Sequence, residues 1–570
     1  MKLKYVLYMA AALSLTGCND SFLERGPQNL NDQSFWVSVD DLKAYANVFY
    51  GLIPGGVSVL DDTDSDIQVP NNINSFLWGQ YVVPTEGGVW QKSSWQNIRN
   101  INYFMTHYQS VQAAEADVNI YVAEMRFFRA LEYFNKIQLL GDVPWLEVDL
   151  NVDSEELYGP KMKRNQVFQK IIEDLDFAIQ WLPEAGSEEA NRLNKDIARH
   201  VKARFCLNEG THYKYHDELE YASEAEKWLQ MAATESDKLI TSGRYEIYNT
   251  GHPQEDYFNM YRIDDKSDLK EAVLYVDYKT NIREHNMAAA GREAGCGFSK
   301  SFVESFLCSD GLPISLSNKY LGDETMRKET ANRDPRLKQL ILTNDFPTNV
   351  TDDLKDSTFV VNEDEFITQH CFTGYRPIKG FNPIYSQALY MKSSFDGIAY
   401  RYAETLLINA EAKAELNTIT NADLDRTVNQ LRDRVGMPHL TVNVGFTDPK
   451  WPDWGYSLSP VLQEIRRERC IELAGEGFRF NDLKRWKAGK LLNNVLTYVG
   501  KRKPDGNLAI VYHNYTNPDL SYQAGKAVLG RTRCTFIRFR QENFREIRNC
   551  YHRIRDGRCS NNGFPSCDLD

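Results

Sequence analysis

The sequence lacks the short patterns that mark the commonest nucleotide-binding and hydrolytic enzymes. It contains no Cys-x-x-Cys pair and no Walker, Rossmann, HExxH or GxSxG pattern. The missing cysteine pairs argue against a zinc knuckle, and the other absences remove the commonest enzymes without removing all of them. Basic residues are fewer than acidic ones, 66 against 79, so the formal net charge is -13. A general affinity for nucleic acid or anionic lipid is therefore disfavoured, and a neutral or cationic ligand fits better.

Cysteines are too few and too scattered to predict a disulfide framework. The chain has 10 of them, and an odd number would remain if Cys18 were modified. Cys206 lies in a helical pattern, IARHVKARFCLNEG, where a small buried hydrophobic residue is the expected role.

The first residues have the pattern of an export signal. Lys2 and Lys4 are followed by an apolar run from Val6 to Leu15, and the run closes on Leu-Thr-Gly-Cys with Cys18. This run is too short to span a bilayer as a helix, which indicates a signal peptide over residues 1–17. A cysteine at the cleavage point resembles the bacterial lipobox, so we expect lipidation of Cys18 and an exported, lipid-anchored protein. The alternative is that Cys18 is an ordinary buried cysteine.

Apolar residues recur at helical spacing along much of the chain. The pattern appears in segments 95–138, 165–183 with 194–213, and 400–417 with 422–437. Each pair of helices has an apolar face that it cannot bury alone, so we expect pairs to stack. The prediction is a mainly α-helical fold, with a helix-pair scaffold over about 36–250 and 398–490. Residues 251–397 are rich in Gly, Asn, Pro and aromatics and predict a large loop-rich insertion carrying short strands, such as AVLYVDY.

Three glutamates lie four residues apart on one predicted helical face, at Glu464, Glu468 and Glu472. Paired carboxylates could serve as acid and base in a glycosidase. Each of them also has an arginine within one turn, which favours an ion-paired structural helix. Ion pairing depresses carboxylate pKa values and so argues against a general acid.

Several longer motifs together identify a family. They are CNDSFLERGPQNLNDQSFW, AEMRFFRALEYFNKIQLLGDVPW, SDGLPI with NRDPRL, RYAETLLINAEAKAELN, LRDRVGM and RERCIELAGEGFRFNDLKRW. With these motifs, over roughly residues 18–500, the chain resembles the SusD/RagB nutrient-binding lipoproteins of the Gram-negative outer membrane. The resemblance implies tetratricopeptide-like helix pairs that support a variable loop face. It also implies no catalysis: the family captures glycans or other nutrients and delivers them to a SusC-type TonB-dependent transporter.

The end of the chain departs from the family pattern. We take residues 18–529 as the SusD-like domain, because residues 530–570 carry nine Arg, no Lys and five acidic residues. The cysteines Cys534, Cys550, Cys559 and Cys567 also lie in this segment. One interpretation is a basic interaction tail. We favour a frameshifted or otherwise aberrant reading frame, because composition, cysteine density and family ending change together.

A long uncharged segment predicts a sugar-binding loop. Residues 67–85, IQVPNNINSFLWGQYVVPT, lie between Asp66 and Glu86 without one charge. Amides donate and accept hydrogen bonds with hydroxyls, and aromatic faces pack on the C–H faces of sugar rings. The candidate ligand-binding residues here are Trp78, Tyr81 and Trp90, with Asp64 and Asp66 as acceptors. The alternative places Trp78 and Trp90 in the core beneath the loop.

Further candidates lie outside this segment. Asn281, Arg292 and Tyr375 are predicted ligand contacts, and Trp95 is assigned to the core. The resemblance puts variable loops of this kind on the ligand face but carries over no individual binding residue.

No cofactor is expected, and no metal ligand is assigned. Asp62, Asp64 and Asp66 alternate like the opening of a calcium loop, but Ile67 stands where the loop needs glycine and Ile73 where it needs a bidentate glutamate. A looser structural calcium site is the remaining alternative.

The leading functional hypothesis is a surface-exposed, lipid-anchored glycan receptor of the outer membrane. It would capture oligosaccharide for a SusC-type transporter. The alternatives are a glycan-degrading enzyme on a helical scaffold, a transporter lid without its own ligand, and a peptide-binding variant.

Overall fold

The computed structural model describes residues 35–514, except 72–73, 75–76, 78–87, 152, 190, 369, 372, 495 and 503–507. For residues 290, 292, 363, 364, 493, 494 and 496–514 it describes the backbone only. All described residues belong to one compact unit, Met1–Pro518. The predicted signal peptide, the predicted lipidation site Cys18 and the unusual segment 530–570 lie outside the described residues.

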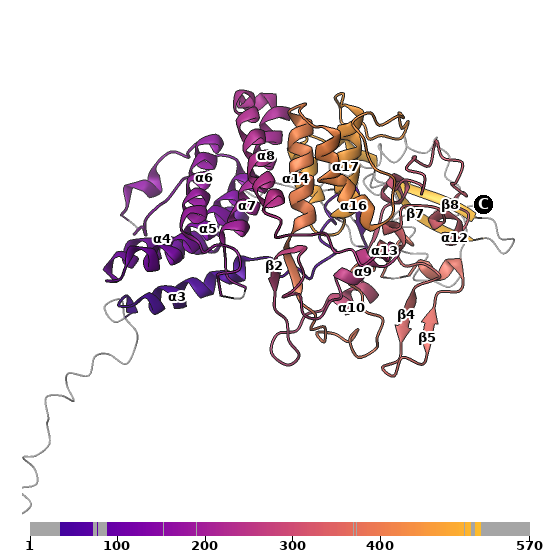
Figure 1. Ribbon diagram of the computed structural model, residues 1–570, viewed down its shortest axis with the longest axis horizontal. Coiled ribbons are helices and arrows are strands. Elements are labelled where there is room, and N and C mark those ends of the chain that lie inside the picture. The colour runs from indigo at the N-terminus through magenta and orange to yellow at the C-terminus, as the bar shows by residue number, and fades with distance from the viewer. Residues whose placement is uncertain are drawn as a thin grey trace, which may run out of the picture. The chain divides into compact units, whose positions relative to one another are not determined.

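Helices from the two ends of the described chain form one scaffold (Figure 1). In chain order they are α3 (Val39–Asn47), α4 (Gln96–His107), α5 (Glu115–Leu140), α6 (Arg164–Trp181), α7 (Lys195–Tyr215), α8 (Ala225–Ser242), α14 (Tyr402–Glu415), α15 (Asn421–Asp425), α16 (Val428–Arg434), α17 (Pro460–Glu472) and α18 (Arg479–Arg485). Helix α5 packs on α6, α7 packs on α8, and α14 lies against α8 and α17. The predicted mainly α-helical, helix-pair fold is confirmed.

Helix boundaries follow local chemistry. Helix α5 ends where the sequence GDVPW begins, and Gly141 takes a left-handed φ of 71° there. The predicted helix 422–437 is instead two short helices, α15 and α16, because Thr427 between them has φ -131° and ψ -96°, outside the helical range. Periodicity alone does not reveal such a break.

The insertion carries short helices and strands. Its helices are α9 (Asp256–Met260), α10 (Met287–Arg292), α11 (Lys300–Ser305), α12 (Met326–Thr330) and α13 (Arg336–Leu340). The strands of the described chain are β1 (Gln68–Pro70), β2 (Ala272–Val276), β3 (Cys296–Phe298), β4 (Pro347–Val350), β5 (Ser357–Phe359), β6 (Gly397–Arg401), β7 (Leu496–Arg502) and β8 (Leu508–Asn514). The expected strand in AVLYVDY is β2.

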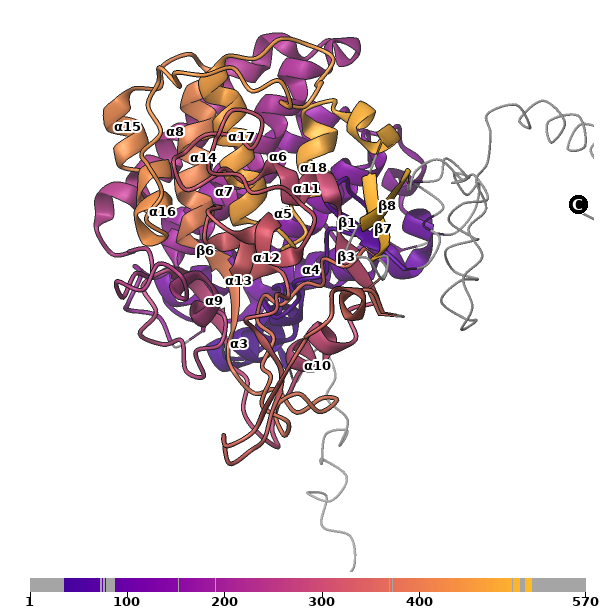
Figure 2. The same cartoon turned by 90° about the vertical axis from the view of Figure 1, so that its right-hand side faces the viewer.

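The strands pair into two-stranded antiparallel sheets: β1 with β3, β2 with β6, β4 with β5, and β7 with β8. In the second sheet Ala272 lies opposite Arg401, and Val276 lies opposite Gly397. The chain therefore leaves the scaffold and returns to it at one sheet. Figure 2 shows β1, β3, β7 and β8 on the same side of the unit.

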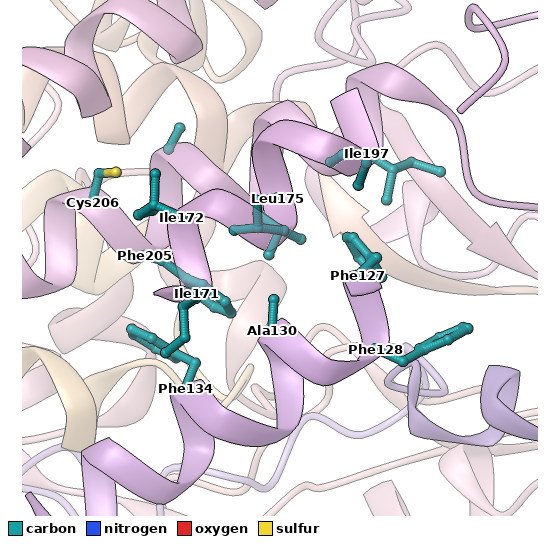
Figure 3. Packing of buried hydrophobic residues seen from close by; sticks show 14 of the residues in the cluster. Phe127, Phe128, Ala130, Phe134, Ile171, Ile172, Leu175, Ile197, Phe205 and Cys206 are labelled. Atoms are coloured by element: carbon teal, nitrogen blue, oxygen red, sulfur yellow. The ribbon is translucent and has the colours of Figure 1, made fainter. Parts of the chain in front are cut away.

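The main core fills the spaces between the helix pairs (Figure 3). Phe134 of α5 and Phe205 of α7 stack with their ring planes 8° apart. Cys206 is fully buried beside them with a free thiol, as the sequence predicts. A buried apolar side chain contributes about 1.5–3 kcal/mol, so this cluster carries much of the scaffold's stability.

A second core joins the insertion to the scaffold. Its members come mostly from the insertion, such as Phe302 and Leu337, but Val435 and Ile471 also belong to it. Val435 follows α16 and Ile471 lies on α17. The insertion is therefore packed onto these two helices rather than hanging from the scaffold.

A buried ion network centred on Glu472 lies at the same junction. Its carboxylate accepts hydrogen bonds from Arg434 at 2.6 Å, from Arg401 at 2.6 Å and from Arg336 at 3.0 Å. Arg401 also donates to Glu271 at 2.9 Å. Because Arg336 begins α13 and Arg434 lies on α16, the network links insertion and scaffold.

The ion-paired interpretation of the three glutamates fits this geometry, with two differences. Glu464 pairs with Arg467 one turn along α17, at 3.5 Å, as expected, but the three arginines that bind Glu472 come from other elements. Burial alone would raise the pKa of Glu472, but these three guanidinium groups outweigh burial and hold it well below its ordinary value. For Glu464 burial dominates and the pKa is raised, so the expected depression is wrong at that position.

Within the described residues, no helix combines the length and apolarity needed to cross a bilayer.

We predict that Glu472→Gln lowers the free energy of unfolding by about 3–5 kcal/mol, because it leaves several buried guanidinium groups short of a counter-charge. Denaturant unfolding measures this change. The matched control is Glu246→Gln, which breaks an exposed 3.2 Å pair with Lys270 and should change stability by less than about 0.5 kcal/mol. Equal effects of the two substitutions would contradict the structural role of the network.

Candidate ligand-binding cavity

A cavity of about 570 Å³ lies between α11, α17, α18 and the segment 448–454. Helices α11, α17 and α18 can be seen in Figure 2. Asp66 and Ile67 line one edge of the cavity, at the start of the predicted uncharged segment 67–85. Its size falls within the range of ordinary small-molecule sites. We call it the tryptophan cavity, after Trp451 and Trp454.

The two tryptophans are held in place through their indole nitrogens. Trp451 Nε1 donates to Glu464 Oε1 at 2.7 Å, and Trp454 Nε1 donates to Gln463 Oε1 at 2.7 Å. Trp454 is buried, while Trp451 is half-buried and lines the cavity. Because both rings are fixed through one edge, their faces are pre-positioned for packing.

The segment that carries these tryptophans is shaped by Asp448. One carboxylate oxygen accepts the backbone N–H of Lys450 at 2.8 Å and the hydroxyl of Ser315 at 3.1 Å. The other accepts Arg467 Nη2 at 2.5 Å. Ser459 then caps α17, whose first residue is Pro460. The tryptophan segment is thus tied to the insertion at one side and to α17 at the other.

Charged side chains around the cavity mostly neutralise one another. Lys450 Nζ lies 2.9 Å from Glu304, and Lys490 Nζ lies 3.6 Å from Asp453. Arg466 beneath the cavity is paired with Glu415 at 2.9 Å, and its guanidinium lies 4.9 Å from the centre of the Trp454 ring. A ligand in this cavity therefore meets few unpaired charges.

The cavity contains a thiol with no catalytic character. Cys470 lines the wall, and burial raises the pKa of its thiol to about 12. The thiolate that nucleophilic or redox chemistry requires is therefore not populated near neutral pH.

The turn after α17 supports one side of the cavity. Gly475 has φ 82°, and a Cβ there would approach the backbone oxygen of Val59 to 2.3 Å. The buried Asp62 accepts the backbone N–H groups of Gly475 at 2.7 Å and Arg479 at 2.9 Å. Burial raises the pKa of Asp62 to about 7, against the lowering effect of those two N–H groups.

The predicted acidic residues are engaged by the protein itself. Asp66 lines the tryptophan cavity, but Arg479 grips its carboxylate with two hydrogen bonds of 2.7 Å. Asp64 is exposed and accepts a hydrogen bond from the amide of Asn74. With Asp62 bonded to the turn after α17, the three alternating aspartates have separate protein partners. No group of three or more His, Cys, Asp or Glu side chains suited to a metal ion occurs in the described part of the chain.

Trp90 lies apart from the tryptophan cavity and is exposed rather than in the core. It is 42% exposed, stacks on Trp95 at 6.1 Å between ring centroids, and has Lys161 Nζ 4.3 Å from its ring centre. Trp95 packs against the main core, as predicted. Trp90 therefore stays a candidate platform for a ligand.

The remaining candidates have different outcomes. Asn281 is exposed, with φ 62°, in the turn between Lys279 and Arg283. Tyr375 is a correction: it is buried in the insertion core and its hydroxyl donates to Glu329 at 3.0 Å, which leaves it no surface for a ligand. Trp78, Tyr81 and the side chain of Arg292 lie outside the described residues.

Trp451 and Trp454 are not among the predicted ligand contacts, although the sequence around them carries a signal. WPDWGY places two tryptophans, a proline and a glycine just before a charged helix. It differs from the predicted loop 67–85, which has amides and no charge, because it contains Asp453. No local pattern shows that this segment lines one cavity with Asp66 and α11.

We predict that stability falls more steeply with rising pH in the wild type than in Asp62→Asn. The folded-state pKa of Asp62, about 7, lies above its ordinary 3.8, so between these values the folded state keeps a proton that the unfolded state releases. The free energy of unfolding therefore decreases as pH rises through this window. Urea unfolding between pH 5 and pH 7 compares the slopes, with the exposed Asp40→Asn as control; identical slopes in all three proteins would contradict the prediction.

The known proteins that resemble this chain in sequence are consistent with the described fold. Residues 242–539 match the sequence profile of the SusD family, slightly more than half of the chain and ten residues into the unusual segment 530–570. The SusD-like protein P2 of Formosa agariphila is 24% identical over 523 residues, which cover 86% of this chain and 92% of that protein. A SusD-like protein of Bacteroides ovatus is 29% identical over 227 residues, 36% of this chain and 39% of that one.

Solved structures share the architecture. A SusD-like protein of Bacteroides fragilis superimposes with a TM-score of 0.66 at 22% identity, covering 85% of this chain and 92% of its own. A SusD-like carbohydrate-binding protein of Bacteroides fragilis gives 0.63 at 19% identity, covering 87% and 99%. A structure solved with xylogluco-oligosaccharide gives 0.57 at 16% identity, covering 88% and 100%. At these identities the likeness is one of fold.

Proposed function

The chain belongs to the SusD family, and from that premise we propose that it is a cell-surface receptor that captures oligosaccharide and delivers it to a SusC-type TonB-dependent transporter. Relatives described as carbohydrate-binding, and the neighbour solved with xylogluco-oligosaccharide, support a glycan as the ligand class. The lipobox-like end at Cys18 supports an anchor in the outer membrane.

The observation that carries the proposal is the wall of the tryptophan cavity. Trp451 offers a fixed aromatic face beside polar neighbours such as Gln463, in a space where most charges are already paired. Sugar rings have apolar C–H faces and hydroxyl edges, so this combination suits a neutral glycan. It suits an ionic ligand less well, because no concentrated charge of one sign faces the cavity.

The same wall supports binding without bond cleavage. Glycosidases need one carboxyl group held protonated and a second one free to ionise and act. Here Asp66 and Asp448 are engaged by Arg479 and Arg467. Glu464, whose pKa is raised, is bonded to the Trp451 indole and does not line the cavity. We therefore propose a receptor rather than an enzyme.

We predict that Trp451→Ala weakens glycan binding at least tenfold, because it removes the aromatic face. Isothermal titration of the soluble protein, begun after Cys18, against a panel of oligosaccharides measures the effect, with micromolar or weaker affinity expected for the wild type. Trp451→Phe keeps a ring and should lose less. Tyr390→Ala, at a 78% exposed position in the insertion, is the control and should bind like the wild type. Thermal melts confirm that each variant is folded.

Two results would change the proposal. If Trp90→Ala abolishes binding and Trp451→Ala does not, the glycan site is the Trp90 platform instead. Release of any product by the pure protein would overturn the receptor in favour of an enzyme, and transporter binding without any glycan binding would favour a lid.

We predict that Cys18→Ser abolishes acylation and moves the protein from the membrane fraction to the soluble fraction. The sulfur of Cys18 is the atom that would carry the lipid, and the serine hydroxyl does not replace it. Mass spectrometry of the mature N-terminus and fractionation measure both effects, with Asn19→Gln as the neighbouring control. An unprocessed wild-type precursor with a free thiol in the cytosol would refute the anchor.

A further inference from the structure

A second cavity, of about 500 Å³, lies among α5, α7, α14, α18 and the segment 52–59. We call it the asparagine cavity, because Asn135, Asn208 and Asn481 line it from three different helices. None of the candidate ligand-binding residues whose side chains are described lines it.

Most charged groups of the asparagine cavity are paired with one another. Arg204 binds Glu404 through both Nε, at 2.7 Å, and Nη2. Asp482 accepts hydrogen bonds from Arg469 Nε at 2.8 Å and Arg485 Nε at 2.9 Å. The exposed Asp61 accepts the hydroxyl of Ser58 at 2.6 Å instead of a basic side chain. Because the arginines are already paired, an anionic ligand would have to displace an existing partner, whereas a neutral ligand would not.

Some hydrogen-bond donors remain. Arg401 and Arg469 line the cavity and are 3% and 4% exposed, yet Arg401 Nε and Arg469 Nη1 have no hydrogen-bond partner among the described residues. A buried donor left without a partner costs about 1–3 kcal/mol. Both nitrogens lie beneath the accessible surface of the cavity, so they are a cost of the buried arginines and do not themselves contact a ligand.

The groups of this cavity that a ligand can contact include two amides and an aromatic ring. The amides of Asn135 and Asn481 are exposed, and neither has a hydrogen-bond partner within the described chain. The half-buried Phe478 lines the same cavity, with the Arg204 guanidinium 5.1 Å from its ring centre. Free amides next to an aromatic ring match the hydroxyl edges and C–H faces of a sugar.

We propose that the asparagine cavity is a second binding site, for a neutral, hydroxyl-rich molecule of one or two sugar rings. The ligand class rests on the proposed function, but the site is distinct from the tryptophan cavity. The corner between α17 and α18 forms a wall of both: Cys470 and Arg479 line the tryptophan cavity, whereas Arg469 and Phe478 line the asparagine cavity. Sugars would then bind on both sides of the corner between α17 and α18.

Hydrogen–deuterium exchange of the soluble protein locates each site directly. The probes are neutral mono- and disaccharides, with the matching uronic acids for comparison. We expect neutral sugars to protect residues 448–454 at the tryptophan cavity and residues 52–59, which line only the asparagine cavity, at the second site. The double variant Asn135→Ala with Asn481→Ala should need about tenfold more sugar for protection of 52–59, since it loses two amide contacts. Its protection of 448–454 should not change.

The matched control is Asn443→Ala, an exposed asparagine outside both cavities. Protection of 448–454 alone in the wild type would overturn the second site and leave the proposed function standing. Protection of 52–59 alone would overturn the tryptophan cavity as the glycan site and retain the second one. Tighter binding of uronic acids than of neutral sugars at 52–59, with strong salt dependence, would overturn the neutral ligand class.

Discussion

The buried carboxylate of Glu472 is the constraint on which the described fold depends. Three arginines from different parts of the chain converge on it, and two of them, Arg401 and Arg434, also contact Glu271. A buried charge without partners is very costly, so this set of residues is stable only when α13, α16, α17 and β6 meet as they do. The hydrophobic contacts of Val435 and Ile471 then hold the insertion on the scaffold. Polar pairing fixes the geometry of the junction, and apolar burial supplies most of its stability.

That junction also determines where cavities can form. Immediately after Glu472 the chain turns at Gly475, and buried Asp62 fixes this turn through two backbone N–H groups. The turn aims Arg479 into one cavity and Phe478 into the other. The proposed glycan binding needs rigid, pre-positioned faces more than it needs reactive groups. A corner held by buried hydrogen bonds provides that rigidity.

Prediction from sequence succeeded where local spacing carries the information. Helical periodicity found α4 to α7 and α14, and the GDVPW break marked the end of α5. Prediction from the sequence failed where burial depends on distant contacts. Tyr375 looked like a ligand contact but lies in the insertion core against Glu329. Asp66 looked like a free acceptor but is paired with Arg479, 413 positions away in the sequence. The tryptophans of WPDWGY were visible in the sequence, yet nothing local shows that they line a cavity.

Helical class, paired helices and family motifs can be predicted from the sequence, because these depend on residue types at fixed short spacings. The sequence also indicated that the glutamates of α17 would be ion-paired with neighbouring arginines. The folded chain was needed to show which distant arginines bind Glu472, which tryptophans face a cavity, and which asparagines line one cavity. Those outcomes depend on side chains brought together from positions far apart in the chain, and no local pattern records which distant segment will supply the partner.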